Sequence, residues 1–294
     1  MKKLISVIMP TYNRSDLVGV SIKSVLSQTY RDFELIVVDD GIEERAEKVV
    51  KSFNDDRIRY IQHEKSKGGG AARNTGIKNA KGEFVAFLDD DDEWAQNKLE
   101  IQVRQFEKTD DSIGFSFTAV ENITDTGSFC TNVPDGVQDF HERALKRFSG
   151  FLTVTLMIKK QVFEEVGVFD EIFPSNQEPD LMIRVTKEYK GLGINKPLSF
   201  VNMKEHEHIN SNWDNRINGR KMILEKYQDD FNKYPKYLAK HYFDLALMCR
   251  DVKYFKEAKK YFVKAIKINF KLLYIAHYFN VLVKSFLLFG DTKN

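Results

Sequence analysis

Short apolar runs alternate with segments of helical periodicity over about the first ninety residues. The apolar runs have the length of single strands and occupy residues 4–9, 34–38, 57–62 and 84–88. Between the first two runs, Val18, Ile22 and Val25 fall at helical spacing. Further helices are predicted after the second and the third run. Strands that alternate with helices in this way predict an α/β protein with a mostly parallel sheet flanked by helices.

Each predicted strand is followed by residues that suit a binding site. In chain order these are Pro10-Thr11-Tyr12, Asp39-Asp40, a glycine loop at residues 68–70 that leads to Arg73, and the acids at 89–92. In a parallel sheet, ligands bind beyond the carboxyl ends of the strands. The sequence therefore predicts one site built from all four segments, although each alone is a weak signal.

The four consecutive acids at positions 89–92 are the most unusual of these segments. Their like charges repel one another, and a bound cation or solvent would relieve that repulsion. Asp89 and Asp91 project to the same side of an extended chain, which suits Mg²⁺ or Mn²⁺. A solvated acidic turn is the alternative interpretation of such a run in isolation.

The turn after the first predicted strand limits the class of ligand. It contains no glycine, so it does not match the phosphate-binding turn of a nicotinamide or flavin site. No glycine loop closes in Lys-Ser or Lys-Thr, as a P-loop requires. A nucleoside diphosphate fits, with Asp40 accepting hydrogen bonds from the base or ribose. The glycines at 68–70 either let the backbone approach this ligand or form a mobile loop.

From about residue 215 the pattern changes to helices rich in Lys, Tyr and Phe. Residues 238–269 look like a single tetratricopeptide-type helix pair, and a lone pair cannot form a solenoid. The last predicted helix, 270–289, is apolar except for a narrow stripe of His277, Asn280 and Lys284. Its apolar surface needs cover from the neighbouring helices, from a partner chain such as a second copy, or from a membrane interface.

Composition is that of an ordinary globular protein, with 42% hydrophobic and 30% charged residues. The net charge is −8 over residues 1–215 and +10 over residues 216–294. A basic end favours an anionic membrane surface, and an acidic front gives no support to a nucleic-acid partner. Cys130 and Cys249 fit no metal or redox spacing, and no apolar run has the length of a signal peptide or a spanning helix. We therefore expect a cytoplasmic protein, peripheral at the inner face of the membrane.

Four motifs occur together in an order typical of one family. They are Val7-Ile8-Met9-Pro10-Thr11-Tyr12-Asn13, Leu35-Ile36-Val37-Val38-Asp39-Asp40-Gly41, Ala72-Arg73-Asn74-Thr75-Gly76 and Phe87-Leu88-Asp89-Asp90-Asp91-Asp92. Over roughly residues 3–210 the chain resembles the family 2 glycosyltransferases of bacterial polysaccharide assembly. The resemblance implies the GT-A nucleotide-diphospho-sugar transferase fold and transfer of a sugar, with inversion, from a nucleotide donor that is most often a UDP-sugar. The chain departs from the family at Ile42, where Ser is usual.

The resemblance also implies roles for single residues in donor binding. Pro10, Thr11 and Tyr12 would line the nucleoside pocket. Asp40 would contact the uracil, and Arg73 would lie by the base or the phosphates.

The acids hold the DxD position of the family. By the resemblance, Asp91 would bind the divalent metal, Mn²⁺ or Mg²⁺. Asp89 would assist at the ribose or the metal, and Asp90 would belong to the same donor site.

A candidate general base lies beside the helix predicted near residue 180. Transfer to an acceptor hydroxyl needs a base on the face of the sugar opposite the leaving group. Pro179 suits the first helical position, which places Glu178 at the helix cap facing the site. The base of the family occupies the matching position, so Glu178 is the predicted base and Asp180 the fallback. A helix-capping acid is the alternative role for Glu178.

His206-Glu207-His208 follows a predicted strand at 198–203. In an extended segment, His206 or His208 would supply a third metal ligand or a phosphate contact. A solvated polar loop is the alternative.

The main interpretation is a metal-dependent, inverting glycosyltransferase with a catalytic domain at 1–214 and a helical region at 215–294. It would move a hexose or N-acetylhexosamine to a hydroxyl of a glycan or lipid-linked acceptor in cell-surface polysaccharide or capsule synthesis. The alternatives are a nucleotidyltransferase on a similar sheet, or an inactive sugar-nucleotide-binding or assembly module that acts through the helical tail.

Overall fold

The fold is taken from a computed structural model that describes residues 3–203 and 212–290, the last four by their backbone alone. The chain divides into two compact units. The α/β unit comprises residues 1–171 and 177–206, and the helical unit comprises residues 172–176 and 207–294. The predicted domain boundary at 214/215 lies a few residues beyond the point at which the second unit begins.

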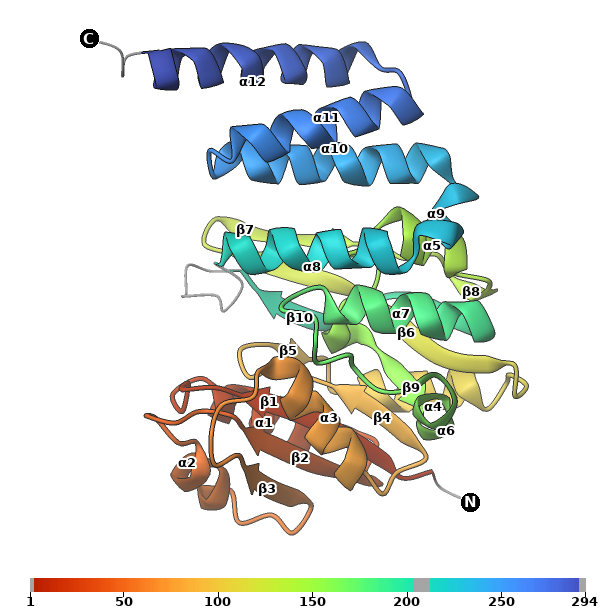
Figure 1. The fold of residues 1–294 in the computed structure, drawn as a ribbon. Coiled ribbons are helices and arrows are strands. Elements are labelled where there is room, and N and C mark those ends of the chain that lie inside the picture. Colours follow the sequence, from red (N-terminus) through yellow and green to blue (C-terminus); the bar gives the residue numbers. More distant parts are fainter. Residues whose placement is uncertain (1–2, 204–211, 291–294) are drawn as a thin grey trace. The chain divides into compact units, whose positions relative to one another are not determined.

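A ten-stranded mixed sheet forms the centre of the α/β unit (Figure 1). Its main path runs β3-β2-β1-β4-β9-β6-β10-β5, with β7 added to β6 and β8 added to β10. The strands are β1 (Ile5–Thr11), β2 (Phe33–Asp39), β3 (Ile58–Gln62), β4 (Phe84–Phe87), β5 (Glu93–Trp94), β6 (Ile113–Thr124), β7 (Gly127–Thr131), β8 (Gly136–Gln138), β9 (Met157–Lys159) and β10 (Lys190–Asn202).

The first four strands pair in parallel, with β1 between β2 and β4. The apolar side chains of β1, β2 and β4 are buried on both faces of the sheet, which explains their continuous apolar runs, whereas those of the edge strand β3 are half-buried. The register pairs Thr11 with Asp39, so the carboxyl ends of β1 and β2 lie level with each other. This arrangement confirms the predicted α/β fold.

The second half of the sheet contains antiparallel pairs. β9 is antiparallel to both β4 and β6, whereas β6 and β10 are parallel. Residues 153–158 form a short 3₁₀ helix, η1 (Thr153–Thr155), that leads into β9. The Thr155 hydroxyl donates to the Leu152 carbonyl, a local side-chain bond that competes with strand pairing.

Helices connect the strands of the α/β unit. They are α1 (Val18–Leu26), α2 (Glu47–Ser52), α3 (Gly69–Asn79), α4 (Lys98–Phe106), α5 (His141–Lys146), α6 (Lys160–Val166) and α7 (Gln177–Glu188). Helix α1 buries Val18, Ile22 and Val25, as their spacing predicts. Helix α7 begins at Gln177, so Pro179 is the third helical residue rather than the first. A proline is tolerated throughout the first turn because those N–H groups have no partner within the helix.

The helical unit contains α8 (Trp213–Lys226), α9 (Gln228–Asn232), α10 (Pro235–Asp251), α11 (Phe255–Ile268) and α12 (Leu272–Gly290). Helices α10 and α11 form the predicted pair, and α12 packs against them through the Phe243 and Tyr274 rings, 4.4 Å apart. His277 belongs to this buried side, because its ring lies 5.3 Å from that of Phe243. The exposed side of α12 carries large apolar side chains together with Asn280 and Lys284. No helix within the described part of the chain is both long and apolar enough to span a bilayer.

Candidate functional site

The carboxyl end of β1 meets the acidic run that follows β4. The Thr11 hydroxyl donates to Asp90 at 2.7 Å, and both residues are buried. The Arg14 guanidinium forms ion pairs with Asp91 at 2.7 Å and with Asp90 at 3.3 Å. Arg14 was not among the predicted site residues, although it follows directly after the Pro10-Thr11-Tyr12-Asn13 segment that predicts the site.

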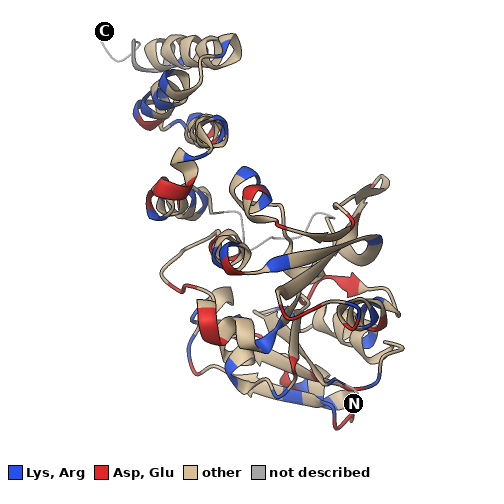
Figure 2. Cartoon of the chain, turned by 90° about the vertical axis from the view of Figure 1, so that its right-hand side faces the viewer, with Lys and Arg blue, Asp and Glu red and all other residues tan. Residues whose placement is uncertain are grey.

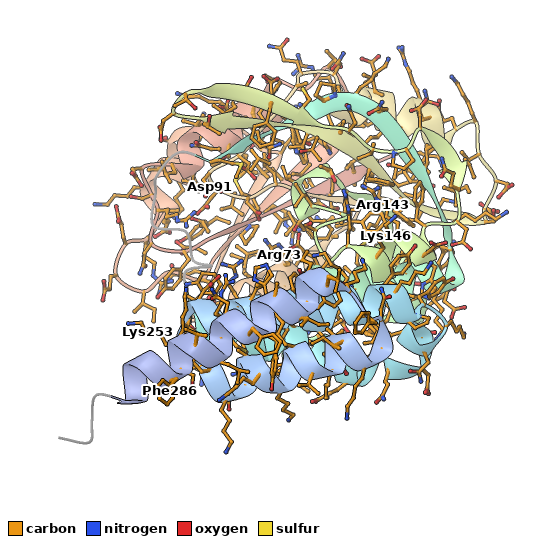
Figure 3. The ribbon with its side chains drawn as sticks, turned by 90° about the horizontal axis from the view of Figure 1, so that it is seen from above. Arg73, Asp91, Arg143, Lys146, Lys253 and Phe286 are labelled. Atoms are coloured by element: carbon orange, nitrogen blue, oxygen red, sulfur yellow. The ribbon has the colours of Figure 1, made fainter. Side chains whose placement is uncertain are left out.

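Arg73 reaches the same acids from α3. Its guanidinium donates to Asp89 at 2.6 Å, and its buried Nε has no hydrogen-bond partner among the described residues. Burial alone would lower the pKa of Arg73, but the charges of Asp89, Glu178 and Asp90 raise it, so this side chain stays cationic. Figure 3 labels Arg73 and Asp91, the two oppositely charged sides of this cluster.

Acidic side chains outnumber basic ones at this edge of the sheet. Burial raises the pKa of Asp90 to about 6, against the hydrogen bond from Thr11 and the charge of Arg14. Burial, together with the charges of Asp89 and Asp91, raises the pKa of Asp92 to about 8. Two arginines thus face four carboxyl groups, and a bound cation would relieve the mutual repulsion of the ionised ones.

Asp89 and Asp91 have the donor chemistry for a hard divalent ion. Only Oδ1 of Asp89 and Oδ2 of Asp91 are engaged by arginine, so each carboxylate keeps one oxygen without a hydrogen bond to a described residue. No cluster of three or more His, Cys, Asp or Glu arranged to hold a metal occurs among the residues described here. Mg²⁺-type sites commonly combine one or two carboxylates with substrate phosphates. Asp89 and Asp91 therefore fit a metal that a bound diphosphate completes.

Asp40 lies under the glycine loop and is almost fully enclosed. Its two carboxylate oxygens accept four hydrogen bonds of 2.7–2.8 Å, from His63 Nδ1, the Ser66 hydroxyl and the backbone N–H groups of Lys67 and Gly68. Burial would raise the pKa of Asp40, but these hydrogen bonds lower it. Gly68 has a φ of 91°, a conformation that favours glycine. A uracil contact would have to replace one of these donors, so that contact stays a prediction.

The remaining predicted nucleoside residues flank this edge. Pro10 is half-buried within β1, whereas Tyr12 is 38% exposed and lies just past its end. Asn13 adopts a positive φ of 49°, and its side-chain oxygen accepts from the backbone N–H groups of residues 42–44. Asn13 thus ties the β1 turn to the β2 turn, a role that residue spacing did not indicate.

Glu178, the predicted general base, is held through one of its two carboxylate oxygens. Its Oε1 accepts hydrogen bonds from both the backbone N–H and the hydroxyl of Thr153 in η1, while Oε2 bonds to no described residue. Gly70 lets α3 approach this region, because a Cβ there would lie 2.7 Å from the Gln177 side chain. Glu178 also borders a narrow surface crevice without room for a water molecule, with Pro179 and Met182 on one side and residues 144–151 on the other. One oxygen is fixed and the other is available to a ligand.

Asp180, the fallback base, is placed differently. It is fully buried and pairs with Arg184 at 2.8 Å. Arg184 in turn donates to the carbonyls of Val166, Gly167 and Val168. Asp180 therefore secures the turn between α6 and α7, and this placement favours Glu178 as the base.

A buried lysine and its hydrogen-bond partner support η1, and residue spacing did not indicate them. Lys98 is fully buried, lies 4.0 Å from the Trp94 ring and donates to Gln102 Oε1. Gln102 donates to the Thr155 carbonyl, and the Trp94 indole donates to that of Val154. Burial lowers the pKa of Lys98 well below its ordinary value. These bonds hold the element that anchors Glu178.

His206 and His208, the predicted third metal ligands, lie outside the described residues.

Comparison with known proteins identifies the class. The family model for glycosyl transferase family 2 matches residues 6–169, more than half of the chain, and the chain belongs to this family. This confirms the resemblance drawn from the four motifs.

Among named relatives is the Escherichia coli protein WfgD, described as a UDP-Glc:alpha-D-GlcNAc-diphosphoundecaprenol beta-1,3-glucosyltransferase. The chain is 42% identical to WfgD over 127 residues, which are 43% of this chain and 50% of WfgD. It is 45% identical over 100 residues to WcaA of *Escherichia coli* K12, a putative colanic acid biosynthesis glycosyl transferase, covering 33% of this chain and 36% of WcaA. An uncharacterized glycosyltransferase of *Rickettsia felis* is 35% identical over 191 residues, which are 63% of this chain and 31% of that protein. The chain thus spans between about a third and a half of these relatives.

Solved structures share the fold. *S. aureus* TarS 1–349 in complex with UDP aligns with a TM-score of 0.66 at 18% identity, over 90% of this chain and 80% of that one. The mannosyltransferase PcManGT from *Pyrobaculum calidifontis*, in complex with GDP-Man and Mn²⁺, aligns with a TM-score of 0.58 at 17% identity, over 100% and 82%. The α/β unit therefore has the GT-A fold.

Proposed function

We propose that the chain transfers a sugar from a nucleotide-diphospho-sugar to an acceptor hydroxyl, with inversion, in cell-surface glycan synthesis. The observation that carries this proposal is the pairing of two features in one unit. An acid–arginine cluster lies at the carboxyl edge of the sheet, and Glu178, with one free oxygen, lies within electrostatic reach of Arg73 in that cluster. The first suits a diphosphate leaving group, and the second suits activation of a hydroxyl.

A UDP-sugar is the proposed donor. WfgD, which is 42% identical over the matched region, is described as acting on UDP-Glc. Fold neighbours at lower identity are described with UDP or with GDP-Man, so the fold alone does not select the base. The sugar is proposed as a hexose or N-acetylhexosamine, and the acceptor as a glycan or lipid-linked sugar.

Metal dependence is part of the proposal. Asp91 and Asp89 would hold Mn²⁺ or Mg²⁺ through their free oxygens, and the ion would act as a Lewis acid toward the departing diphosphate. Arg73, fixed by Asp89, would place a second positive charge there, and its unpartnered Nε is a free donor for a phosphate oxygen.

Glu178 would act on the acceptor. The Thr153 N–H and hydroxyl hold Oε1, which leaves Oε2 to accept the proton of the acceptor hydroxyl. The hydroxyl oxygen bonds to the anomeric carbon while the bond from that carbon to the phosphate oxygen breaks, and the electron pair leaves with the nucleoside diphosphate. Attack from the face opposite the leaving group inverts the anomeric centre.

Calorimetric titration of UDP tests the donor site. We expect binding in the presence of Mn²⁺, weak binding with chelator, and loss of the metal-dependent part in Asp91→Ala. Asp16→Ala removes an exposed acid near the same edge and is the matched control. If neither UDP nor any other nucleoside diphosphate binds with metal present, the transferase proposal is wrong.

Surface association with a membrane is the remaining part of the proposal. The outer side of α12 carries large apolar side chains that are 58–78% exposed, namely Leu272, Phe279, Val283 and Phe286. Figure 2 shows α12 almost entirely without charge, and Lys284 is the single charged residue among residues 272–290. Figure 3 places Lys253 at the same end of the helical unit as Phe286.

An anionic lipid surface is the occupant that matches this pattern. Residues 216–294 carry a net charge of +10, which opposes self-association of two copies and favours anionic lipid. We expect the full chain to float with vesicles that contain phosphatidylglycerol, and the double variant Phe279→Ser/Phe286→Ser not to float. Phe129→Ser, which removes a ring of similar exposure from β7, is the control. Flotation that is equal for all variants, or dimerisation that the double variant abolishes, would refute the membrane proposal.

A further inference from the structure

A buried series of hydrogen bonds leads from Lys98 to the backbone of η1. Lys98 Nζ donates to Gln102 Oε1 at 2.8 Å, and Gln102 Nε2 donates to the Thr155 carbonyl at 3.2 Å and to the Ser116 hydroxyl at 3.1 Å. The Thr155 carbonyl can only accept, so Nε2 must face it and Oε1 must find a donor on its other side. Lys98 supplies that donor and thereby fixes the orientation of the Gln102 amide.

A buried lysine is an unfavourable group to supply one hydrogen bond. The side chain of Lys98 is fully buried, and burial lowers its pKa well below the ordinary value. Within the described part of the chain its amine contacts the Trp94 ring and the Gln102 oxygen but no carboxylate. An apolar side chain of similar size would stabilise the fold more. Stability therefore does not account for Lys98, and such departures from the usual burial pattern are typical of functional positions.

Buried side chains also fix the carbonyl groups of the last two residues of η1. The Val154 carbonyl accepts from the Trp94 indole at 2.9 Å and from the Ser199 hydroxyl at 3.1 Å. The Thr155 carbonyl accepts from Gln102. A single turn of helix has few hydrogen bonds of its own, so these side-chain bonds determine how η1 is oriented.

The first residue of η1 holds the predicted base. Thr153 donates its backbone N–H, at 2.8 Å, and its hydroxyl to Glu178 Oε1. The strand β5 and the helix α4, which carry the support of η1, follow directly after the acids at 89–92. One stretch, residues 89–102, therefore carries both the acids of the proposed donor site and the side chains that orient the support of Glu178.

We propose that Lys98 is a positioning residue for sugar transfer: through Gln102 and η1 it fixes the Glu178 carboxylate relative to the acids at 89–92. The inference rests on the proposed function and adds to it a residue that touches neither the donor nor the base. Inverting transfer needs the base and the leaving group on opposite faces of the anomeric carbon. A displacement of about 1 Å in such an arrangement lowers the rate on the order of 10²-fold.

Turnover of UDP-Glc with octyl GlcNAc as the acceptor tests the inference in the full chain. We expect Lys98→Met to lower kcat about 10- to 100-fold, with UDP–Mn²⁺ binding unchanged and the unfolding midpoint no lower than that of the wild type. Glu34→Gln is the matched control, because Glu34 is a buried charge whose partners Ser6, Arg59 and Lys81 lie outside η1. It should lower the midpoint and leave kcat near the wild-type value.

Two outcomes of this comparison overturn the inference. One is a wild-type kcat in Lys98→Met. The other is a fall in kcat together with weaker UDP binding or a lower unfolding midpoint, which would assign Lys98 a general structural role.

A double-mutant cycle tests the route through Gln102. Gln102→Met removes the donor to Thr155 directly, so we expect it to lower kcat at least as much as Lys98→Met. Because Lys98 acts only by orienting this amide, the double variant Lys98→Met/Gln102→Met should have the kcat of Gln102→Met alone. Losses that multiply in the double variant would overturn the route.

Hydrogen exchange tests the inference without any turnover. The Thr153 N–H exchanges when its bond to Glu178 opens, so its rate, measured by NMR, reports how firmly η1 holds the base. We expect Lys98→Met to speed this exchange at least about tenfold, while the amides of β1 and β4 keep their wild-type rates. An unchanged Thr153 rate overturns the inference even where UDP–Mn²⁺ binds and transfer occurs. Absence of UDP binding refutes the proposed function instead, and the exchange rates still show whether Lys98 orders the support of Glu178.

Discussion

The two units differ in the energetically unfavourable side chains that they contain. The α/β unit buries charged side chains: Asp40, Asp90, Asp92, Lys98 and Asp180 are all 6% exposed or less. The helical unit exposes apolar ones, and Leu272 and Phe286 of α12 are 78% and 77% exposed. Buried charge and exposed large apolar surface both cost stability, and both indicate functional surfaces. In this chain the first indicates a site for chemistry and the second a surface for docking.

Glu178→Gln gives the largest expected effect and tests the chemical half of this comparison. Loss of the general base is expected to lower kcat by about 10²- to 10⁴-fold, because such a base contributes that much to proton transfer. UDP binding and the unfolding midpoint should stay near those of the wild type. Glu188→Gln, at an exposed acid of the same helix, is the control, and a wild-type kcat in Glu178→Gln would exclude Glu178 as the base.

Asp180→Ala is expected to act on stability rather than on donor binding. It leaves the Arg184 guanidinium without its buried carboxylate, which should lower the free energy of unfolding by about 2–4 kcal/mol. Denaturant titration measures this loss. An unfolding free energy equal to that of the wild type would show that the Asp180–Arg184 pair does not stabilise the fold.

Asp40→Asn removes the carboxylate that holds the start of the glycine loop, and the resulting loss of stability depends on pH. Its four hydrogen bonds lower the pKa of Asp40 from 3.8, so their stabilisation is complete above about pH 4 and is lost as the pH falls through the lowered value. We expect a loss of about 1–3 kcal/mol in the variant at pH 7, with the difference from wild type shrinking in acid. Asp111→Asn, at an exposed acid, is the control; a difference that persists unchanged below the folded pKa would contradict this explanation.

We expect Lys98→Met to stabilise the α/β unit. That result would show that the fold does not need this buried charge. Because the folded-state pKa of Lys98 is lowered, stability falls as the pH drops from 10.5 toward that value. Methionine removes this dependence, and we expect a net gain of about 1–3 kcal/mol at neutral pH after the lost bond to Gln102. The exposed Lys108→Met should change little, and a loss of stability in Lys98→Met would show that the amine is needed in the core.

Phe286→Ser is expected to have the smallest effect on the isolated chain. Its ring contributes little to the packing of α12, so the free energy of unfolding should change by less than about 0.5 kcal/mol. Tyr274→Ser, on the buried side of the same helix, should cost several times more. Equal costs would mean that the exposed stripe packs within the helical unit in solution.

Local patterns predicted most of the first half of the fold. The continuous apolar runs and the helical spacing of Val18, Ile22 and Val25 sufficed for the parallel strands and α1, because both faces of such a sheet are buried. The region from 110 to 165 was less predictable, since its strands pair across long sequence separations. The short helix η1 illustrates this: its threonines favour a strand locally, but side-chain bonds to nearby carbonyls and the underlying Gln102 set its conformation.

The sequence by itself determined the family, and it predicted the sheet edge, the acids and the arginine of the proposed donor site. It could do so because these residues follow strands whose carboxyl ends must meet. Only the tertiary structure distinguished Glu178, with one free oxygen, from Asp180, enclosed by Arg184, although the two are neighbours in sequence. It alone held Glu178 against Thr153 of η1 and turned His277 inward on α12. Partners of this kind depend on which helix faces meet, and residue spacing along one helix carries no information about its neighbour.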